Sequence, residues 1–176
     1  MLDSQRRYVS LRYVALLPLA LFVPVVLALL IDPSVVWGEY LGVFFHLSIL
    51  LLVSRLDAAP WARAAGYGWV VLDVLAGILM INDIPYETAW AVRLGGHVLA
   101  GVWIVASSLV SRSWLVRIAG LVSGVWLAGY SFVGTTVPEE YLSPAGIVTA
   151  VWFALLAVYG RESEEVPAPR AVPAQA

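Results

Sequence analysis

Residues 13–31 read YVALLPLALFVPVVLALLI, an apolar stretch that contains no charged side chain. A helix needs about 20 mainly apolar residues to cross the hydrocarbon core of a bilayer, and this stretch has that length. Five similar stretches follow, at residues 35–53, 66–81, 89–109, 114–133 and 143–159. The sequence therefore predicts an all-α integral membrane protein folded as a six-transmembrane-helix bundle.

The composition agrees with a membrane protein and leaves no room for a soluble domain. Of the 176 residues, 61% are hydrophobic and 12% are charged, which is far from the balance of soluble domains. Residues 1–160 are predicted to form one transmembrane domain, and residues 161–176, rich in Pro, Ala and Glu, a disordered cytoplasmic tail. Any activity is expected within the membrane or at its two surfaces.

The arginines predict how the bundle is oriented. Basic side chains are retained on the cytoplasmic side of a membrane, and nine of the ten arginines fall on one predicted face, whereas Arg93 alone falls on the other. Both termini are therefore expected in the cytoplasm, and the membrane is expected to be the plasma (inner) membrane. The opposite face carries acids: Asp32, Glu39, Asp83, Glu87, Glu139 and Glu140. These acids either concentrate cations or only mark loops from which arginine is excluded.

Three ionisable side chains, His46, Asp73 and His97, lie inside the predicted spans. With a rise of about 1.5 Å per residue, each falls within roughly 4 Å of the midpoint of its span. A charge at this depth costs at least about 2.5 to 3.5 kcal/mol on insertion scales, so Asp73 should face the bundle interior, protonated or paired with a histidine. The three are candidates for a substrate- or proton-binding site. The alternative is that they are polar contacts that hold the helices together.

Helical spacing adds two further candidates to this site. Glu39 shares a helix face with Gly42 and His46, and Arg93 shares a face with His97. Each polar face runs from the outer surface to the middle of the span, as an access route would.

Small residues at four-residue spacing mark the fifth stretch. Gly120, Gly124 and Ala128 form a ridge that permits close helix contact. The ridge is predicted to serve packing within the bundle or, alternatively, a homodimer or a partner membrane protein. The other partner is the lipid bilayer, and no nucleic-acid partner is expected.

The sequence contains no signature of conventional enzyme chemistry. It has no Cys, and all ten basic residues are Arg, so thiol chemistry and lysine Schiff bases are excluded. No metal-protease motif and no glycine-rich phosphate loop is present. No catalytic residue and no metal site is therefore predicted.

Three functions remain open. The first is transport, or an accessory role in transport, with His46, Asp73 and His97 as the site. In size and topology the chain is similar to the S-components of energy-coupling-factor importers, although no motif matches. The second is an assembly or regulatory subunit in which the polar residues are purely structural. The third is a redox protein that binds one b-type haem between His46 and His97, since two imidazoles at similar depth are a minimal ligand set; otherwise no cofactor is predicted.

Overall fold

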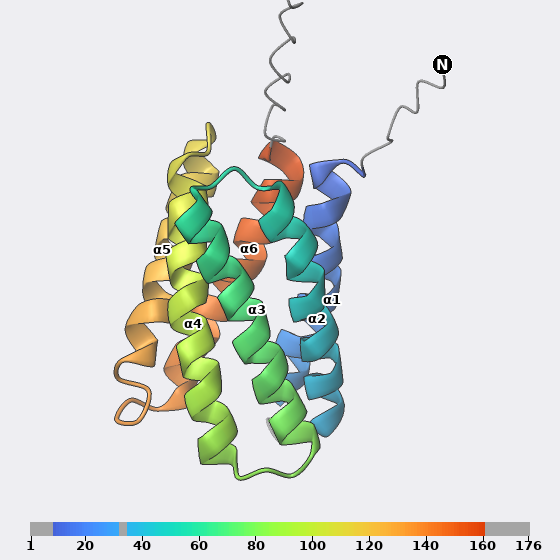
Figure 1. The fold of residues 1–176 in the computed structure, drawn as a ribbon, viewed down its shortest axis with the longest axis vertical. Coiled ribbons are helices and arrows are strands. Elements are labelled where there is room, and N and C mark those ends of the chain that lie inside the picture. Colours follow the sequence, from blue (N-terminus) through green and yellow to red (C-terminus); the bar gives the residue numbers. More distant parts are fainter. Residues whose placement is uncertain (1–8, 32–34, 161–176) are drawn as a thin grey trace, which may run out of the picture.

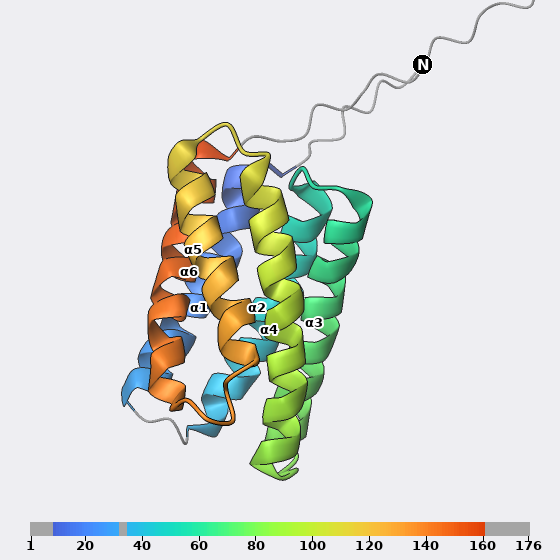
Figure 2. The ribbon, with the colours of Figure 1, turned by 90° about the vertical axis from the view of Figure 1, so that its left-hand side faces the viewer.

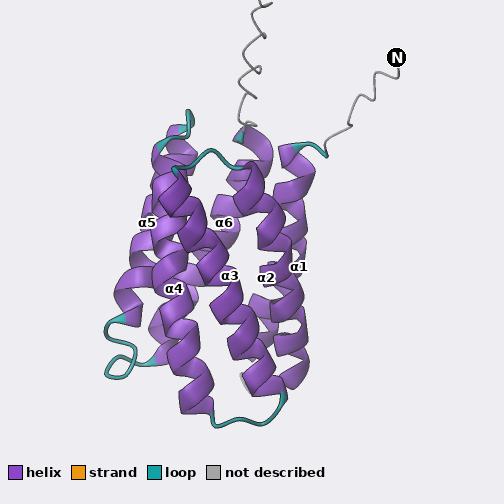
Figure 3. Cartoon of the chain, in the orientation of Figure 1, coloured by secondary structure: helices purple, strands orange, loops and turns teal. Residues whose placement is uncertain are grey.

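The computed structural model describes residues 9–31 and 35–160, and this part of the chain consists of helices joined by loops (Figure 3). Six long helices follow one another: α1 (Leu11–Ile31), α2 (Val36–Arg55), α3 (Pro60–Ile81), α4 (Tyr86–Leu109), α5 (Trp114–Ser131) and α6 (Ser143–Tyr159). A short 3-10 helix, η1 (Glu139–Leu142), leads into α6. With η1 counted as part of the sixth, all six are long and apolar enough to cross a membrane. The predicted all-α class with six such helices is confirmed, while the predicted tail lies outside the described residues.

The six helices run alternately up and down and close into a ring (Figures 1 and 2). Each helix packs against the next one in the sequence, and α6 packs against α1. The ring therefore has an interior to which every helix contributes one face.

The two ends of the ring differ in charge. One end, the upper end in Figure 1, includes the loops at 56–59 and 110–113 and carries Arg12, Arg55, Arg63, Arg112 and Arg117. The other includes the loops at 82–85 and 132–138 and carries Asp83, Glu87, Glu139 and Glu140. We refer to them as the arginine end and the acidic end. Which end faces the cytoplasm stays a prediction.

Two helices begin three or more residues earlier than hydrophobicity alone suggests. The third was expected to start at 66 and the fourth at 89, but α3 begins at Pro60 and α4 at Tyr86. Proline suits the first turn of a helix because its fixed φ is already helical and its missing N–H is not needed there. A search for apolar stretches misses these first turns, because Arg63 and Glu87 interrupt the apolar pattern.

A closed circuit of aromatic rings fills the middle of the bundle. Each ring contacts the next in the following order, and the last contacts the first: Phe22 of α1, Phe45 of α2, Trp69 of α3, Trp103 of α4, and Trp152 and Phe153 of α6. Neighbouring ring centroids are 4.6 to 6.2 Å apart, which is the range of favourable aromatic packing. We call this set the aromatic collar.

Helix α5 adds no ring to the collar and approaches its neighbours through small residues instead. A Cβ on Gly120 would lie 2.8 Å from the indole nitrogen of Trp152. A Cβ on Gly101 of α4 would overlap the carbonyl oxygen of Gly124 and lie 2.7 Å from the Cβ of Ala128. The ridge of Gly120, Gly124 and Ala128 thus packs inside the monomer, while a partner protein stays a prediction.

We expect Gly101→Ala to destabilise the protein by about 1 to 3 kcal/mol, because the added methyl group meets backbone that has no room to move. The measurement is thermal unfolding in detergent. Gly129→Ala is the matched control, since a Cβ there meets no heavy atom within 4 Å. Equal melting temperatures for the two variants would contradict the close α4–α5 contact.

Candidate functional site

His46 of α2 and Asp73 of α3 meet in the interior of the ring. The Nε2 atom of His46 lies 3.0 Å from Oδ2 of Asp73, whose side chain is 0% exposed. The indole N–H of Trp69, one turn away on α3, donates a hydrogen bond to the same oxygen. The Nδ1 atom of His46 lies 2.7 Å from the carbonyl oxygen of Gly42. Two of the three predicted central residues are therefore in direct contact.

These contacts set the number of protons that the pair holds. A carbonyl oxygen only accepts hydrogen bonds, so Nδ1 of His46 carries a hydrogen. The contact between Nε2 and Oδ2 then requires one further proton, which sits either on the imidazole or on the carboxyl group. The pair is neutral overall with this proton and has one negative charge without it. The geometry thus requires a single proton that the two groups share.

Glycines allow the helices to come close enough for this pairing. A Cβ on Gly96 of α4 would lie 2.5 Å from Oδ1 of Asp73, so the carboxyl group packs directly on the α4 backbone. Asp73 shares its buried helix face with Trp69, Ala76 and Gly77. Packing on bare backbone explains how a carboxyl group is held at the contact between α3 and α4.

A second pair, between Glu39 and Arg93, lies nearer the acidic end. The two side chains form a bidentate contact, with Nη2 to Oε2 at 2.5 Å and Nη1 to Oε1 at 3.2 Å. They are 15% and 16% exposed. The contact joins α2 to α4. Gly77 of α3 lies beside it, and a Cβ added to Gly77 would be 3.7 Å from Oε2 of Glu39. Glu39 lies seven residues before His46, which places this pair about 10 Å closer to the acidic end.

His97 lies beside the first pair without bonding to it. It follows Gly96, on which the Asp73 carboxyl group rests, and its Nδ1 atom is buried without a hydrogen-bond partner. The rings of His97 and Trp90 are nearly perpendicular, with their centroids 6.3 Å apart. Trp90 in turn stacks on Tyr86, with a centroid distance of 5.8 Å. Along α4, a row of side chains therefore leads from the acidic end to His97.

All five predicted site residues lie on the acidic side of the aromatic collar or level with it. Phe45 and Trp69 of the collar contact the imidazole of His46 at centroid distances of 4.6 and 5.6 Å. Between the collar and the arginine end the interior is mainly aliphatic and buried: Leu11, Val14, Ile49, Leu52, Val53, Ile104, Val116 and Leu156. The polar site is thus closed toward the arginine end, and the partly exposed Glu39 and Arg93 lie on its acidic side.

Trp69 is the site residue that the sequence analysis missed. It lies four residues before Asp73, the spacing at which two side chains meet on a helix. This spacing was the available signal, but an indole in a span is also an ordinary packing residue.

The arrangement of His46 does not fit the b-type haem hypothesis. Both ring nitrogens of His46 are engaged, one by Gly42 and one by Asp73, so neither is free to ligate iron. Within residues 9–31 and 35–160, no cluster of three or more His, Asp or Glu side chains is placed to hold a metal ion. We therefore derive no step through haem.

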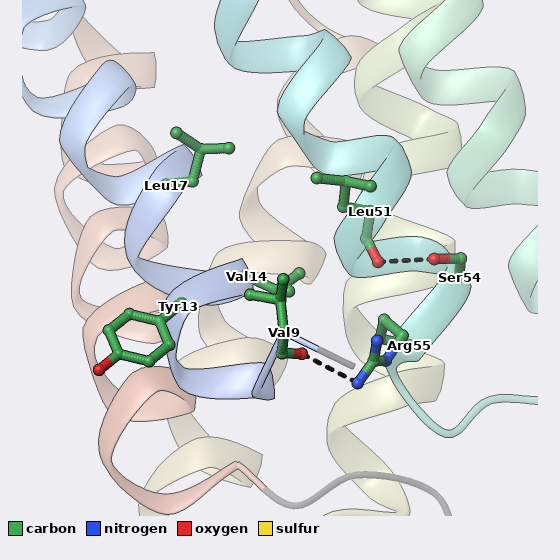
Figure 4. Close-up of a pocket in the computed structure, with 7 residues that line it drawn as sticks. All are labelled: Val9, Tyr13, Val14, Leu17, Leu51, Ser54 and Arg55. Carbon is green, nitrogen blue, oxygen red and sulfur yellow. Dashed lines mark hydrogen bonds between the residues drawn. The ribbon is translucent and has the colours of Figure 1, made fainter. Parts of the chain in front are cut away.

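A separate groove lies between α1 and α2 near the arginine end (Figure 4). It has a volume of about 360 Å³ and is lined by Val9, Tyr13, Val14, Leu17, Leu51, Ser54 and Arg55. Nη2 of Arg55 donates to the carbonyl oxygen of Val9 at 3.0 Å. None of the five predicted site residues borders this groove, and it is not part of the polar site.

Comparison of the chain with protein-family models, curated proteins and solved structures gives no match. The similarity in size and topology to S-components therefore stays a prediction, and the site is interpreted from its own geometry.

We expect Gly96→Ala to displace the Asp73 carboxyl group and destabilise the protein by about 1 to 3 kcal/mol, because the new Cβ would lie 2.5 Å from Oδ1. Thermal unfolding in detergent measures the loss. Gly95→Ala is the control, since the nearest atom to its Cβ is a Leu72 methyl group at 3.5 Å. A Gly96→Ala protein as stable as Gly95→Ala would be inconsistent with this packing.

We expect Glu39→Gln to cost about 3 kcal/mol, because it leaves the Arg93 guanidinium without its counter-charge in the interior. The double variant Glu39→Gln/Arg93→Gln should recover part of this loss, since neither charge then remains. A double-mutant cycle on unfolding in detergent measures the coupling. Glu87→Gln, at an exposed glutamate in the first turn of α4, is the control. Additive effects at Glu39 and Arg93 would rule out an energetic pair.

Proposed function

We propose that the protein is a membrane transport protein, or the membrane subunit of a transport system, whose His46–Asp73 pair takes up and releases one proton. The observation that carries the proposal is the buried contact between Nε2 and Oδ2, which holds one exchangeable proton. Transport cycles commonly use such intramembrane carboxyl and imidazole groups as proton carriers.

The depth of the pair supports a role beyond packing. In the helices as folded, His46 lies within about 1 Å and Asp73 within about 4 Å of the middle of its own helix, counted along the axis. Ionisable groups at such a depth are expensive to insert, even when paired. Small residues already give close helix contact elsewhere in this bundle, as Gly101 and Gly124 do between α4 and α5.

The aromatic collar gives the proposed cycle a direction of access. With the collar closed, the pair exchanges its proton with the acidic end only. Delivery of the proton to the arginine end requires the rings of the collar to separate, whereas the partly exposed Glu39 and Arg93 lie between the pair and the acidic end. The acids at that end attract cations, protons among them.

The second candidate function is an assembly or regulatory subunit, and it is favoured because the charged side chains of the site occur in pairs. The charges of Glu39 and Arg93 neutralise each other, and the His46–Asp73 pair is neutral with its proton. A polar core that only holds helix register, in an assembly or regulatory subunit, has the same pairing. The double variant His46→Leu/Asp73→Leu separates the two functions, because removal of both partners leaves no buried charge uncompensated. A folded double variant with wild-type activity would favour the structural role.

We expect Asp73→Asn to abolish proton flux, since an amide keeps the shape of the carboxyl group but does not take up or release a proton near neutral pH. The measurement uses the full chain in liposomes that contain a pH-sensitive dye, with an imposed potassium diffusion potential as the driving force. Asp83→Asn is the matched control: Asp83 is exposed in the loop at the acidic end, and its positive φ of 57° is tolerated by Asn.

The outcomes of this experiment are distinct. Flux in the wild type and in Asp83→Asn, with loss in Asp73→Asn, supports the proposal. Equal flux in the wild type, in Asp73→Asn and in protein-free liposomes overturns it.

A further inference from the structure

Three buried polar atoms around the site have no hydrogen-bond partner among the described residues. They are Oδ1 of Asp73, Nδ1 of His97 and Nε of Arg93. A buried polar atom without a partner costs about 1 to 3 kcal/mol, and buried waters commonly satisfy such groups by making about three hydrogen bonds each. Three unpaired atoms in one part of the interior therefore point to a common ligand.

The packing brings these atoms into one region. Oδ1 of Asp73 rests on the α4 backbone at Gly96, the residue before His97. Arg93 lies one turn before His97 on the same face of α4. There is open space beside His46, because Gly42, whose carbonyl oxygen contacts Nδ1 of His46, is buried and a Cβ there would meet no heavy atom within 4 Å. The site thus offers both polar partners and room.

The donor and acceptor pattern matches water. Nε of Arg93 is always a donor, and Oδ1 of an ionised Asp73 is an acceptor. A water molecule that accepts from Arg93 has two hydrogens left, one for Oδ1 of Asp73 and one for Nδ1 of His97. The hydrogen of the neutral His97 ring then sits on Nε2.

We propose that a water molecule bound by Asp73, His97 and Arg93 is a proton relay, and that His97 carries the proton between the His46–Asp73 pair and the acidic end. This inference rests on the proposed function and names the route by which its proton arrives and leaves. It assigns His97 a role in transfer, distinct from the storage role of the pair.

The transfer balances as a movement of one proton. The carboxyl group of protonated Asp73 first turns, so that the O–H that faces Nε2 of His46 points to the water instead. This O–H bond breaks as the water accepts the proton, and the water gives one of its own protons to Nδ1 of His97, where an N–H bond forms. His97 is then an imidazolium and Asp73 a carboxylate, and release of the Nε2 proton toward the acidic end returns His97 to a neutral ring. A buried imidazolium is costly in an apolar interior, so the charged ring is a transient carrier.

The groups that share this part of the interior come from four helices. They are Glu39 and His46 on α2, Asp73 on α3, Arg93 and His97 on α4, and Tyr130 on α5, while the exposed Tyr86 lies at the acidic end of α4. Glu39 is engaged by Arg93, Tyr86 by Glu139, and Tyr130 by the carbonyl oxygen of Val137. His97 is the titratable side chain in this set for which the structure gives no hydrogen bond.

The experiment follows the Asp73 proton directly in the full chain in lipid nanodiscs. The carboxylic C=O infrared band that is absent from Asp73→Asn is monitored after a rapid pH step. His97→Phe keeps a ring against Trp90 but has no nitrogen, and we expect it to slow the response of this band about tenfold or more. His97→Gln, which still binds water but does not relay a proton, should be equally slow. In both variants the band should reach a wild-type amplitude at sufficiently low pH.

A rescue experiment separates a relay from a structural role. Imidazole added to His97→Ala should restore a fast response, because it supplies the missing carrier, whereas added imidazole should leave Asp73→Asn unchanged. A wild-type rate in His97→Phe overturns the relay and leaves the proposed function standing. Absence of any pH-dependent Asp73 band in the wild type overturns the proposed function and the relay together.

Discussion

The buried carboxyl group of Asp73 is the constraint on which the polar interior depends. A carboxyl group on a side chain that is 0% exposed needs hydrogen-bond partners, because an unpaired group of this kind is among the most costly features of an apolar interior. His46 and Trp69 supply these partners from α2 and α3, and Gly96 gives the group a place against α4. Three helices are thereby held at close distance by one side chain.

The same constraint divides the ring into two halves. The aromatic collar closes the interior next to His46, and on the arginine side only apolar side chains and a few serines remain buried. On the acidic side lie the second ion pair and His97. The ionisable residues of the site thus lie on the acidic side of the collar or level with it. The proposed proton transport therefore has to include an opening of the collar.

Much of the site was accessible from sequence because it consists of exceptions to an apolar background. His46, Asp73 and His97 were recognisable as the ionisable residues in the middle of their spans, and Glu39 and Arg93 by their spacing from the histidines. The role of Trp69 was not recognisable, since tryptophan is common in apolar helices. The pairing of Glu39 with Arg93 was not accessible either, because it joins α2 to α4, two helices that are not neighbours in the sequence.

The sequence by itself determined the class of fold, since it has six long apolar stretches separated by short polar gaps. In such a stretch the backbone N–H and C=O groups find their hydrogen-bond partners within a helix. It also determined the depth of each ionisable residue, because rise per residue is a constant of the helix. The tertiary structure alone decided which residues meet: His46 bonds to Asp73, while His97 lies beside them without a bond. The physical reason is that rotation and approach of each helix are set by contacts such as those at Gly96 and Gly101, which involve residues far apart in the chain.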